Sequence, residues 1–219
     1  MYIKQQSGKV CPFCGIAALK PITDRNRRNA YDHYIPKAQY PFVSINFNNL
    51  FPLCTDCNSD EKKSYDTPCK NGIRQRILYP YDTTYSFENI TIYINTEEDF
   101  DNITLGTLLS DIDWNIEFNV LDGNIDVFEV WNDIFKIKTR YKETITEFED
   151  TWFTDFVIKK YNENVIGGFK TFSDYKDELI NDSEHLMIKD PLAILKYIYF
   201  NFIFSVPDIE EKLRQVVGQ

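Results

Sequence analysis

The sequence is poor in histidine and in long apolar runs. Its 219 residues include two histidines, His33 and His185, so imidazole chemistry has two candidate positions. The first residues, MYIKQQSGKV, lack the apolar segment of a signal peptide, and the most apolar late segment, residues 192–206, is short and interrupted by Lys196 and Asn201. These absences predict a soluble, cytoplasmic protein that does not have a membrane as its partner.

The composition, in contrast, is rich in material for a packed core. Hydrophobic residues make up 43% of the chain and aromatic residues 16%, which argues against a disordered protein. The net charge of −10 hides two regions of opposite sign: residues 1–80 hold twelve Lys and Arg against six Asp and Glu, whereas residues 81–219 hold 12 against 28. The basic region can attract phosphates, and the acidic region has to face water or another protein. We therefore expect two domains, 1–80 and 81–219, with a boundary at residues 80–84.

The five cysteines fall into two close pairs and one single residue. Cys11 and Cys14 form one CxxC pair, Cys54 and Cys57 form another, and Cys69 stands apart. Two residues between thiolates let a tight turn present both sulfurs to one tetrahedral ion, and two such turns make a closed site of four thiolates. Because a closed site leaves no position for water or substrate, the pattern predicts a structural Zn²⁺.

Three other interpretations of the cysteine pairs stay open: two disulfides in a secreted protein, a thioredoxin-like redox pair, and coincidence. A redox pair is poorly supported, because neither pair follows a recognisable βαβ unit and there are two of them. Gly15 directly after the first pair permits the positive φ that a metal-binding turn often requires. Cys69, between Pro68 and Lys70, is expected to be a free thiol in a loop.

The segment between the cysteine pairs is a long loop whose two ends the metal would fasten together. Residues 29–34 predict a short strand that ends before Pro36, because proline cannot donate to a strand ladder. Residues 41–49 are expected to be irregular, residues 50–53 form a second short extended piece, and residues 58–64 predict a helix. The expected order is strand, loop, strand, helix.

Four polar residues occupy defined places in that order. Asp32 and His33 end the first strand, Asn49 stands at the start of the second, and Asn58 directly follows the second cysteine pair. Together with the cysteine pairs, this pattern over residues 11–65 resembles the HNH endonucleases, also called ββα-metal nucleases, which have a DH pair, an NL pair and a CxxCN or CxxCH sequence at these places. Asn58 replaces the histidine that gives the motif its last letter, and asparagine is a common variant there.

The resemblance implies a division of chemical roles. His33 is the general base that takes a proton from the attacking water, since an imidazole can do so near neutral pH. Asn49 steadies that histidine across the strand pair. Asp32 and Asn58 offer oxygens to one Mg²⁺ or Mn²⁺ ion, which offsets charge on the phosphate and on the leaving oxygen.

Three lysines of the same region, Lys37, Lys62 and Lys63, are expected to hold the nucleic-acid backbone as point charges. Taken singly, the four polar residues have ordinary explanations, a turn for the Asp–His pair and a helix cap for the asparagine after the cysteines. Their agreement in order and spacing with the cysteine pairs favours the nuclease.

Residues 81–219 predict a mixed but mainly helical accessory domain. His185 is expected to be structural or exposed, because its neighbours at 182–184 look like a capped helix start. The first expected elements are paired strands at 86–94 and 115–121 and a turn at 122–124. Helices are expected from residue 127 onward, and Gly167 and Gly168 separate them from a second set of helices. This second set lies near 175–180 and 192–204, and a final helix begins at 207–210.

The fold class expected for the whole chain is α+β: a ββα-metal module held by a zinc site, followed by the helical accessory domain. The implied function is hydrolysis of phosphodiesters in nucleic acid, above all DNA, and the alternative is a non-catalytic zinc module that binds nucleic acid or protein. The layout also resembles nuclease subunits of phage-defence systems such as Septu, in which a separate ATPase is the partner. An HNH enzyme that acts alone fits the sequence too.

Overall fold

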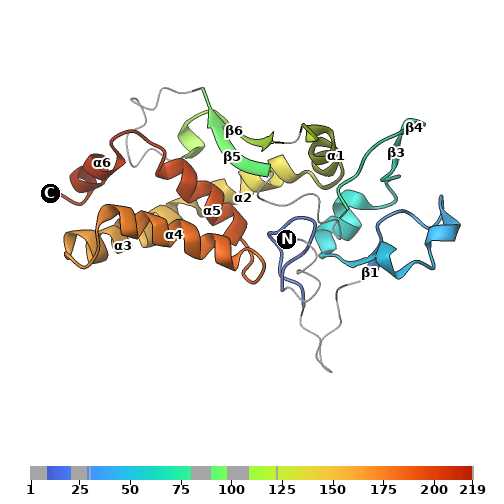
Figure 1. Cartoon of the computed structure of the whole chain (residues 1–219), viewed down its shortest axis with the longest axis horizontal. Helices are drawn as coiled ribbons and strands as arrows, with labels where there is room; N and C mark the ends of the chain where they lie inside the picture. Colours follow the sequence, from blue (N-terminus) through green and yellow to red (C-terminus); the bar gives the residue numbers. More distant parts are fainter. Residues whose placement is uncertain are drawn as a thin grey trace. The chain divides into compact units, whose positions relative to one another are not determined.

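The structure is a computed structural model that describes residues 9–20, 29, 31–79, 90–97, 109–121 and 123–218 (Figure 1). Over these residues the protein is a mixed α/β structure whose strands form three two-stranded sheets, β1–β2, β3–β4 and β5–β6. The domain boundary expected at 80–84, the first part of the strand expected at 86–94, and Asp122 of the expected turn lie outside the described residues. No helix in the described part of the chain is both long and apolar enough to cross a lipid bilayer.

Short strands and helical turns come first along the chain, and long helices follow. The strands are β1 (Tyr31–His33), β2 (Leu50–Pro52), β3 (Cys69–Lys70), β4 (Ile73–Arg74), β5 (Ile90–Thr96) and β6 (Trp114–Val120). The 3-10 helices are η2 (Pro41–Val43), η3 (Phe47–Asn49) and η5 (Leu109–Asp111), and the π-helices are η4 (Asp56–Lys62), η6 (Phe153–Ile158) and η7 (Asn162–Ile166). The α-helices are α1 (Ile125–Phe135), α2 (Ile137–Trp152), α3 (Lys159–Tyr161), α4 (Phe172–Leu186), α5 (Ala193–Ile203) and α6 (Ile209–Val216).

The two strands expected between the cysteine pairs are confirmed as the antiparallel pair β1–β2. β1 is shorter than the expected 29–34, and the loop between the strands contains two 3-10 turns, η2 and η3. Phe51 of β2 is buried, so one face of the pair rests on the core. The register places Tyr31 opposite Pro52, Asp32 opposite Phe51 and His33 opposite Leu50.

The helix after the second cysteine pair begins at Asp56, two residues before its expected start. The Asn58 amide already donates to the Cys54 carbonyl at 3.0 Å, so the helical turn starts inside the cysteine pair. The Lys63 amide donates to the Asn58 carbonyl at 3.1 Å, and Lys63 then leaves the helix with a φ of 46°. The helix therefore ends at Lys62, earlier than the expected residue 64.

Both cysteine pairs belong to the first of two compact units. This unit comprises Met1–Thr91, Phe118–Ile137 and Met187–Leu192. Its core contains a cluster of aromatic rings, in which the centroid of Phe13 lies 5.0 Å from Tyr34, 5.3 Å from Phe51 and 4.8 Å from Phe135. These rings come from the first cysteine loop, the end of β1, β2 and α1, so one cluster joins four segments of the chain.

A buried hydrogen bond also joins the first cysteine loop to α1. The Trp131 indole Nε1 donates to the Phe13 carbonyl at 2.8 Å, although the two residues are 118 positions apart in the sequence. Both residues are buried, and a buried indole N–H needs such an acceptor. Because Phe13 lies between Cys11 and Cys14, this bond fixes the backbone of the first CxxC turn.

The second unit is mainly helical. It comprises Ile92–Glu117, Lys138–Leu186 and Ala193–Gln219. Helical residues continue without a break from Lys138 to Ile166 within this unit, and the break expected at the glycine pair is confirmed there. Gly168 has a φ of 77°, a left-handed conformation that glycine adopts without steric penalty at a helix end. The expected pairing of β5 with β6 and the helices expected near 175–180, near 192–204 and after Pro207 are also confirmed.

Two smaller expectations were wrong. Residues 182–184 lie inside α4 rather than at a helix start, and the buried Ser183 hydroxyl donates to the carbonyl one turn earlier at 2.9 Å, as a serine inside a helix commonly does. His185 is exposed, as expected, and its Nδ1 lies 2.8 Å from the Asn181 carbonyl. Cys69 is a free thiol, as expected, but it belongs to strand β3 rather than to a loop.

Replacing Trp131 with phenylalanine should destabilise the first unit. The change keeps an aromatic ring but removes the donor to the Phe13 carbonyl, and an unsatisfied buried group costs about 1–3 kcal/mol. Urea denaturation should show a free energy of unfolding that is lower by this amount. Trp152→Phe is the matched control, because Trp152 packs on Phe148 and Tyr199 in the second unit. The loss of stability in this variant measures the effect of the smaller ring alone. Equal losses in the two variants would contradict a role for the hydrogen bond.

Candidate metal centre and active site

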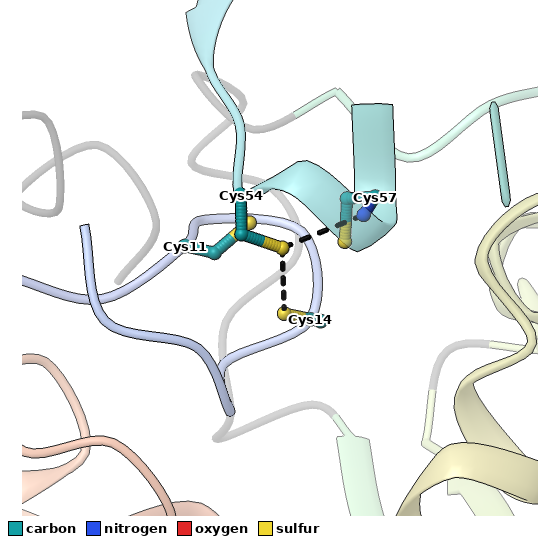
Figure 2. Close-up of side chains that lie close together, drawn as sticks. All are labelled: Cys11, Cys14, Cys54 and Cys57. Carbon is teal, nitrogen blue, oxygen red and sulfur yellow. Dashed lines mark hydrogen bonds between the residues drawn. The ribbon is translucent and has the colours of Figure 1, made fainter. Parts of the chain in front are cut away.

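The two cysteine pairs meet in one buried cluster (Figure 2). The first pair lies on a tight loop, closed at its base by a β-bridge and by a hydrogen bond of 2.9 Å from the Gly15 amide to the Cys11 carbonyl. Gly15 has a φ of 71°, the positive angle expected after this pair. The second pair lies where β2 leads into η4, and the Cys57 amide donates to Cys54 Sγ at 3.4 Å.

The sulfur atoms have the spacing of a tetrahedral ligand set. All four lie within 4.8 Å of one another, and Cys14 Sγ is 3.9 Å from Cys54 Sγ. Zn–S bonds of about 2.3 Å in a tetrahedron put neighbouring sulfurs roughly 3.8 Å apart. None of the four cysteines is more than 4% exposed, so the cluster offers no open side to water or substrate. The cysteines are therefore positioned to hold a metal ion, and a closed set of four thiolates suits structural zinc.

The cysteine thiols of this cluster differ in pKa. Hydrogen bonding with Cys11 lowers the pKa of the Cys54 thiol, whereas hydrogen bonding with Cys11 raises the pKa of the Cys57 thiol well above its ordinary value. Because zinc binds thiolates, metal binding has to displace the protons that remain. The affinity of the cluster for metal should therefore fall as the pH falls.

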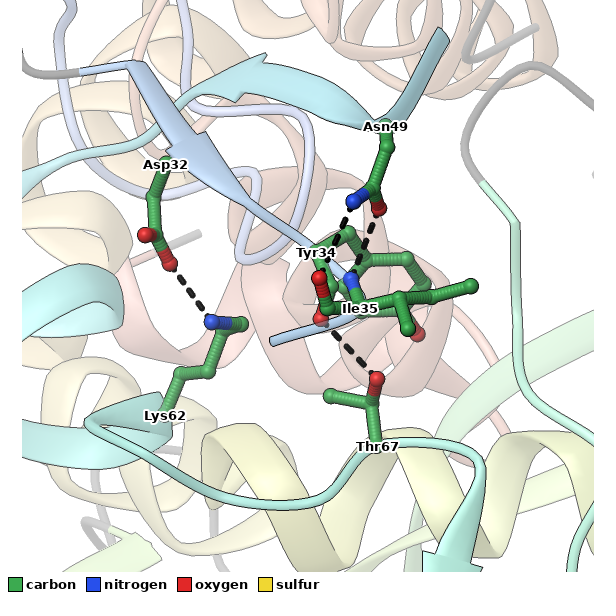
Figure 3. A network of polar contacts seen from close by, with 6 residues as sticks. All are labelled: Asp32, Tyr34, Ile35, Asn49, Lys62 and Thr67. Atoms are coloured by element: carbon green, nitrogen blue, oxygen red, sulfur yellow. Dashed lines mark hydrogen bonds and ion pairs between the residues drawn. The ribbon is translucent and has the colours of Figure 1, made fainter. Parts of the chain in front are cut away.

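A second buried group, the Asn49 amide, holds the end of β1 (Figure 3). Its Oδ1 accepts from the Ile35 amide at 2.7 Å, and its Nδ2 donates to the Ile35 carbonyl at 2.9 Å. The Asn49 carbonyl accepts from the Tyr34 amide at 2.9 Å, and the residue is 4% exposed. The side chain thus continues the pairing of the two strands beyond their last residues and fixes the backbone that follows His33.

The His33 ring is held by the loop between the strands. Its Nε2 lies 3.1 Å from the Ser44 carbonyl oxygen. A carbonyl can only accept, so Nε2 is the ring nitrogen that donates to Ser44, and Nδ1 is the nitrogen left to act as an acceptor. The steadying of His33 that was expected from Asn49 is thus indirect: Asn49 fixes the backbone after the histidine, and Ser44 holds the ring.

Asp32 faces helix η4, where its Oδ2 lies 2.5 Å from Lys62 Nζ (Figure 3). Lys62 is 2% exposed, so the expectation that it presents a point charge to nucleic acid is corrected: it neutralises Asp32 instead. Asn58 stands four residues before Lys62 on the same helix and is half-buried. Lys37 and Lys63 are exposed, as a contact to a phosphate requires.

Asp32 and His33 have different neighbours although they are adjacent in the sequence. Asp32 contacts Lys62 of η4, whereas the His33 ring contacts the Ser44 carbonyl in the loop between the strands. The two side chains are thus held by different elements.

Sequence reasoning missed three partners of this site. Ser44 holds the His33 ring, Lys62 is the counter-ion of Asp32, and the Thr67 hydroxyl donates to the Tyr34 carbonyl at 2.9 Å. Lys62 gave no local signal, because its carboxylate partner lies 30 residues earlier in the sequence. The other two partners lie in irregular segments, where the sequence has no helical or strand periodicity from which contacts could be predicted.

Comparisons with known proteins leave the family open. No protein-family model matches the chain, and no solved structure matches it. Protein ea31 of Escherichia phage lambda is 43% identical over 56 residues, which are 26% of this chain and 16% of the phage protein. The chain thus spans a small part of that relative, and the relative's name states no activity.

The cysteine cluster predicts about one zinc ion per chain in elemental analysis. Cys54→Ser should lose the metal and the folded first unit, because three thiolates no longer close the site. Cys69→Ser is the matched control, since Cys69 is a free thiol outside the cluster, and it should keep the metal. Lowering the pH should speed zinc release in both wild type and control. If reduced protein that was purified without a chelator contains no zinc, the proposed zinc site is refuted.

Removing the Asn49 amide should loosen the end of β1. Asn49→Ala leaves the buried Ile35 amide and carbonyl without their partner, which should lower the free energy of unfolding by about 1–3 kcal/mol. Asn48→Ala changes the exposed neighbour and should have little effect. Chemical denaturation measures both variants, and a stability of Asn49→Ala equal to that of Asn48→Ala would contradict the bracing role.

Proposed function

We propose that this protein is a metal-dependent endonuclease of the HNH type that hydrolyses phosphodiester bonds in DNA. The observation that carries the proposal is the position of Asp32 and His33 at the end of β1, with β2 paired to that strand and η4 in ion-pair contact with it. Strand, strand and helix follow in the order of the HNH pattern, and the buried cysteine cluster joins the helix to the first loop.

His33 acts on the attacking water in this proposal. Its Nδ1 lone pair accepts the proton, and the hydrogen bond from Nε2 to the Ser44 carbonyl stabilises the imidazolium that forms. The bonds between Asn49 and Ile35 limit movement of the backbone that carries the ring. The base is therefore oriented before the substrate arrives.

Asp32 and Asn58 provide the oxygens for the cation. When bound, Mg²⁺ or Mn²⁺ supplies positive charge that offsets the charge developing on the phosphate. Lys62 engages Asp32 through Oδ2, so Oδ1 is the carboxylate oxygen that the ion pair leaves for the metal. The exposed residues Lys37 and Lys63 hold the nucleic-acid backbone. The acidic region 81–219 provides a docking surface for a protein partner such as an ATPase.

A non-catalytic zinc module that binds nucleic acid is the second candidate. One observation favours it: the buried Lys62 ammonium already neutralises Asp32, and a carboxylate paired in this way needs no metal to balance its charge. The two candidates differ in whether His33 is required for turnover.

Purified protein should nick supercoiled plasmid DNA when Mg²⁺ or Mn²⁺ is added. His33→Ala should reduce the rate by roughly 10²- to 10⁴-fold, because it removes the general base. His185→Ala is the matched control, since this exposed histidine lies in α4 and should leave the rate unchanged. Equal nicking by the His33→Ala variant would overturn the assignment. Wild-type protein that binds DNA but does not cut it with either ion would favour the second candidate.

A further inference from the structure

The loop that holds His33 exposes large apolar side chains. Phe42 is 92% exposed, Ile45 84% and Phe47 83%, all within six consecutive residues. Figure 1 shows this loop beyond β1, on the side of the strand away from the cysteine loop. Water-soluble proteins seldom expose such residues together unless the surface binds something.

Hydrogen bonds fix the backbone of this loop while its apolar side chains stay outside. The Ser44 hydroxyl donates to the Pro41 carbonyl at 2.6 Å, and the Asn46 side chain accepts from the Asn48 amide at 3.0 Å. The Asn48 carbonyl accepts from the Tyr79 hydroxyl at 2.8 Å. The backbone of the loop is therefore already ordered, with its apolar side chains pointing outward. Binding of a ligand then costs little backbone conformational entropy.

The position and the charge of the loop both point to the substrate as its ligand. Phe42 lies two residues before Ser44 and Ile45 directly after it, and the Ser44 carbonyl holds the His33 ring, so the loop lies beside the proposed general base. Residues 34–55 contain no Asp or Glu and one basic residue, Lys37, in a chain whose net charge is −10. A polyanion can thus approach the loop without repulsion from the loop's own side chains.

We propose that Phe42, Ile45 and Phe47 form an apolar wedge that contacts the nucleobases of duplex DNA next to the cleaved phosphodiester and partly unstacks them. The inference rests on the proposed nuclease function and adds to it the way in which the substrate is gripped. Aromatic side chains stack on bases of any sequence, and apolar wedges can part adjacent base steps and kink a duplex. The wedge therefore provides affinity and local distortion without selecting a sequence.

The test uses duplex DNA that carries 2-aminopurine at internal positions, and the full-length chain in the His33→Ala background. Binding is then measured without cleavage. The variant Phe42→Ala/Ile45→Ala/Phe47→Ala should bind at least roughly tenfold more weakly and should lose the change in 2-aminopurine emission. Ile73→Ala is the matched control, because Ile73 is 73% exposed and lies in β4, and it should behave like its parent. Circular dichroism and zinc content establish that each variant is folded.

The outcomes separate the wedge from the nuclease. If the triple variant binds and unstacks DNA like the control, the wedge is refuted whether or not wild-type protein cuts DNA. If DNA binding needs the wedge but protein with His33 intact does not cut, the wedge stands and the nuclease fails. If the triple substitution changes the oligomeric state and leaves DNA binding intact, the loop docks a second copy of the chain and the wedge is refuted. Absence of any DNA binding refutes it as well.

Discussion

The four buried sulfur atoms join segments that are 40 residues apart in the sequence, and the rest of the first unit depends on this junction. β1 and β2 have three residues each, and a hairpin of that length has little stability alone. Joining the cysteine loop to the start of η4 closes the long segment between them. A metal crosslink stabilises the fold most when it closes a long segment of this kind. The ring cluster around Phe13 and the Trp131 hydrogen bond then pack against a backbone that is already closed.

The features that the sequence predicted well are those with local signals. Two cysteines at a spacing of two residues define a turn by themselves, and Gly15 and Gly168 stand where the backbone needs a positive φ. The end of the first strand between the cysteines was predicted from Pro36, and the helices of the second unit followed the spacing of their apolar residues. These signals need no knowledge of which distant residues meet. For that reason the order of elements was predictable before their contacts were.

The features that the sequence could not provide depend on distant contacts. Lys62 looked like an exposed cation, because nothing in its neighbourhood reveals that a carboxylate 30 residues away takes its charge. The Ser44 carbonyl that holds the His33 ring is backbone, and any residue could have supplied it. The serine at position 183 resembled a helix cap because capping and intrahelical bonding use the same hydroxyl. The missed partners of Lys62 and His33 are distant in the sequence, whereas the partner of Ser183 lies one helical turn away.

The π-helical form of η4 affects how this segment can vary in length. Hydrogen bonds that span five residues bring side chains five apart to one side of a helix, and Cys57 and Lys62 form such a pair, both buried. In an α-helix the same two side chains would point about 140° apart. A homologue that lacks one residue between them can form an ordinary α-helix and still direct both side chains inward. A gap of one residue at this place in an alignment is therefore compatible with an intact site.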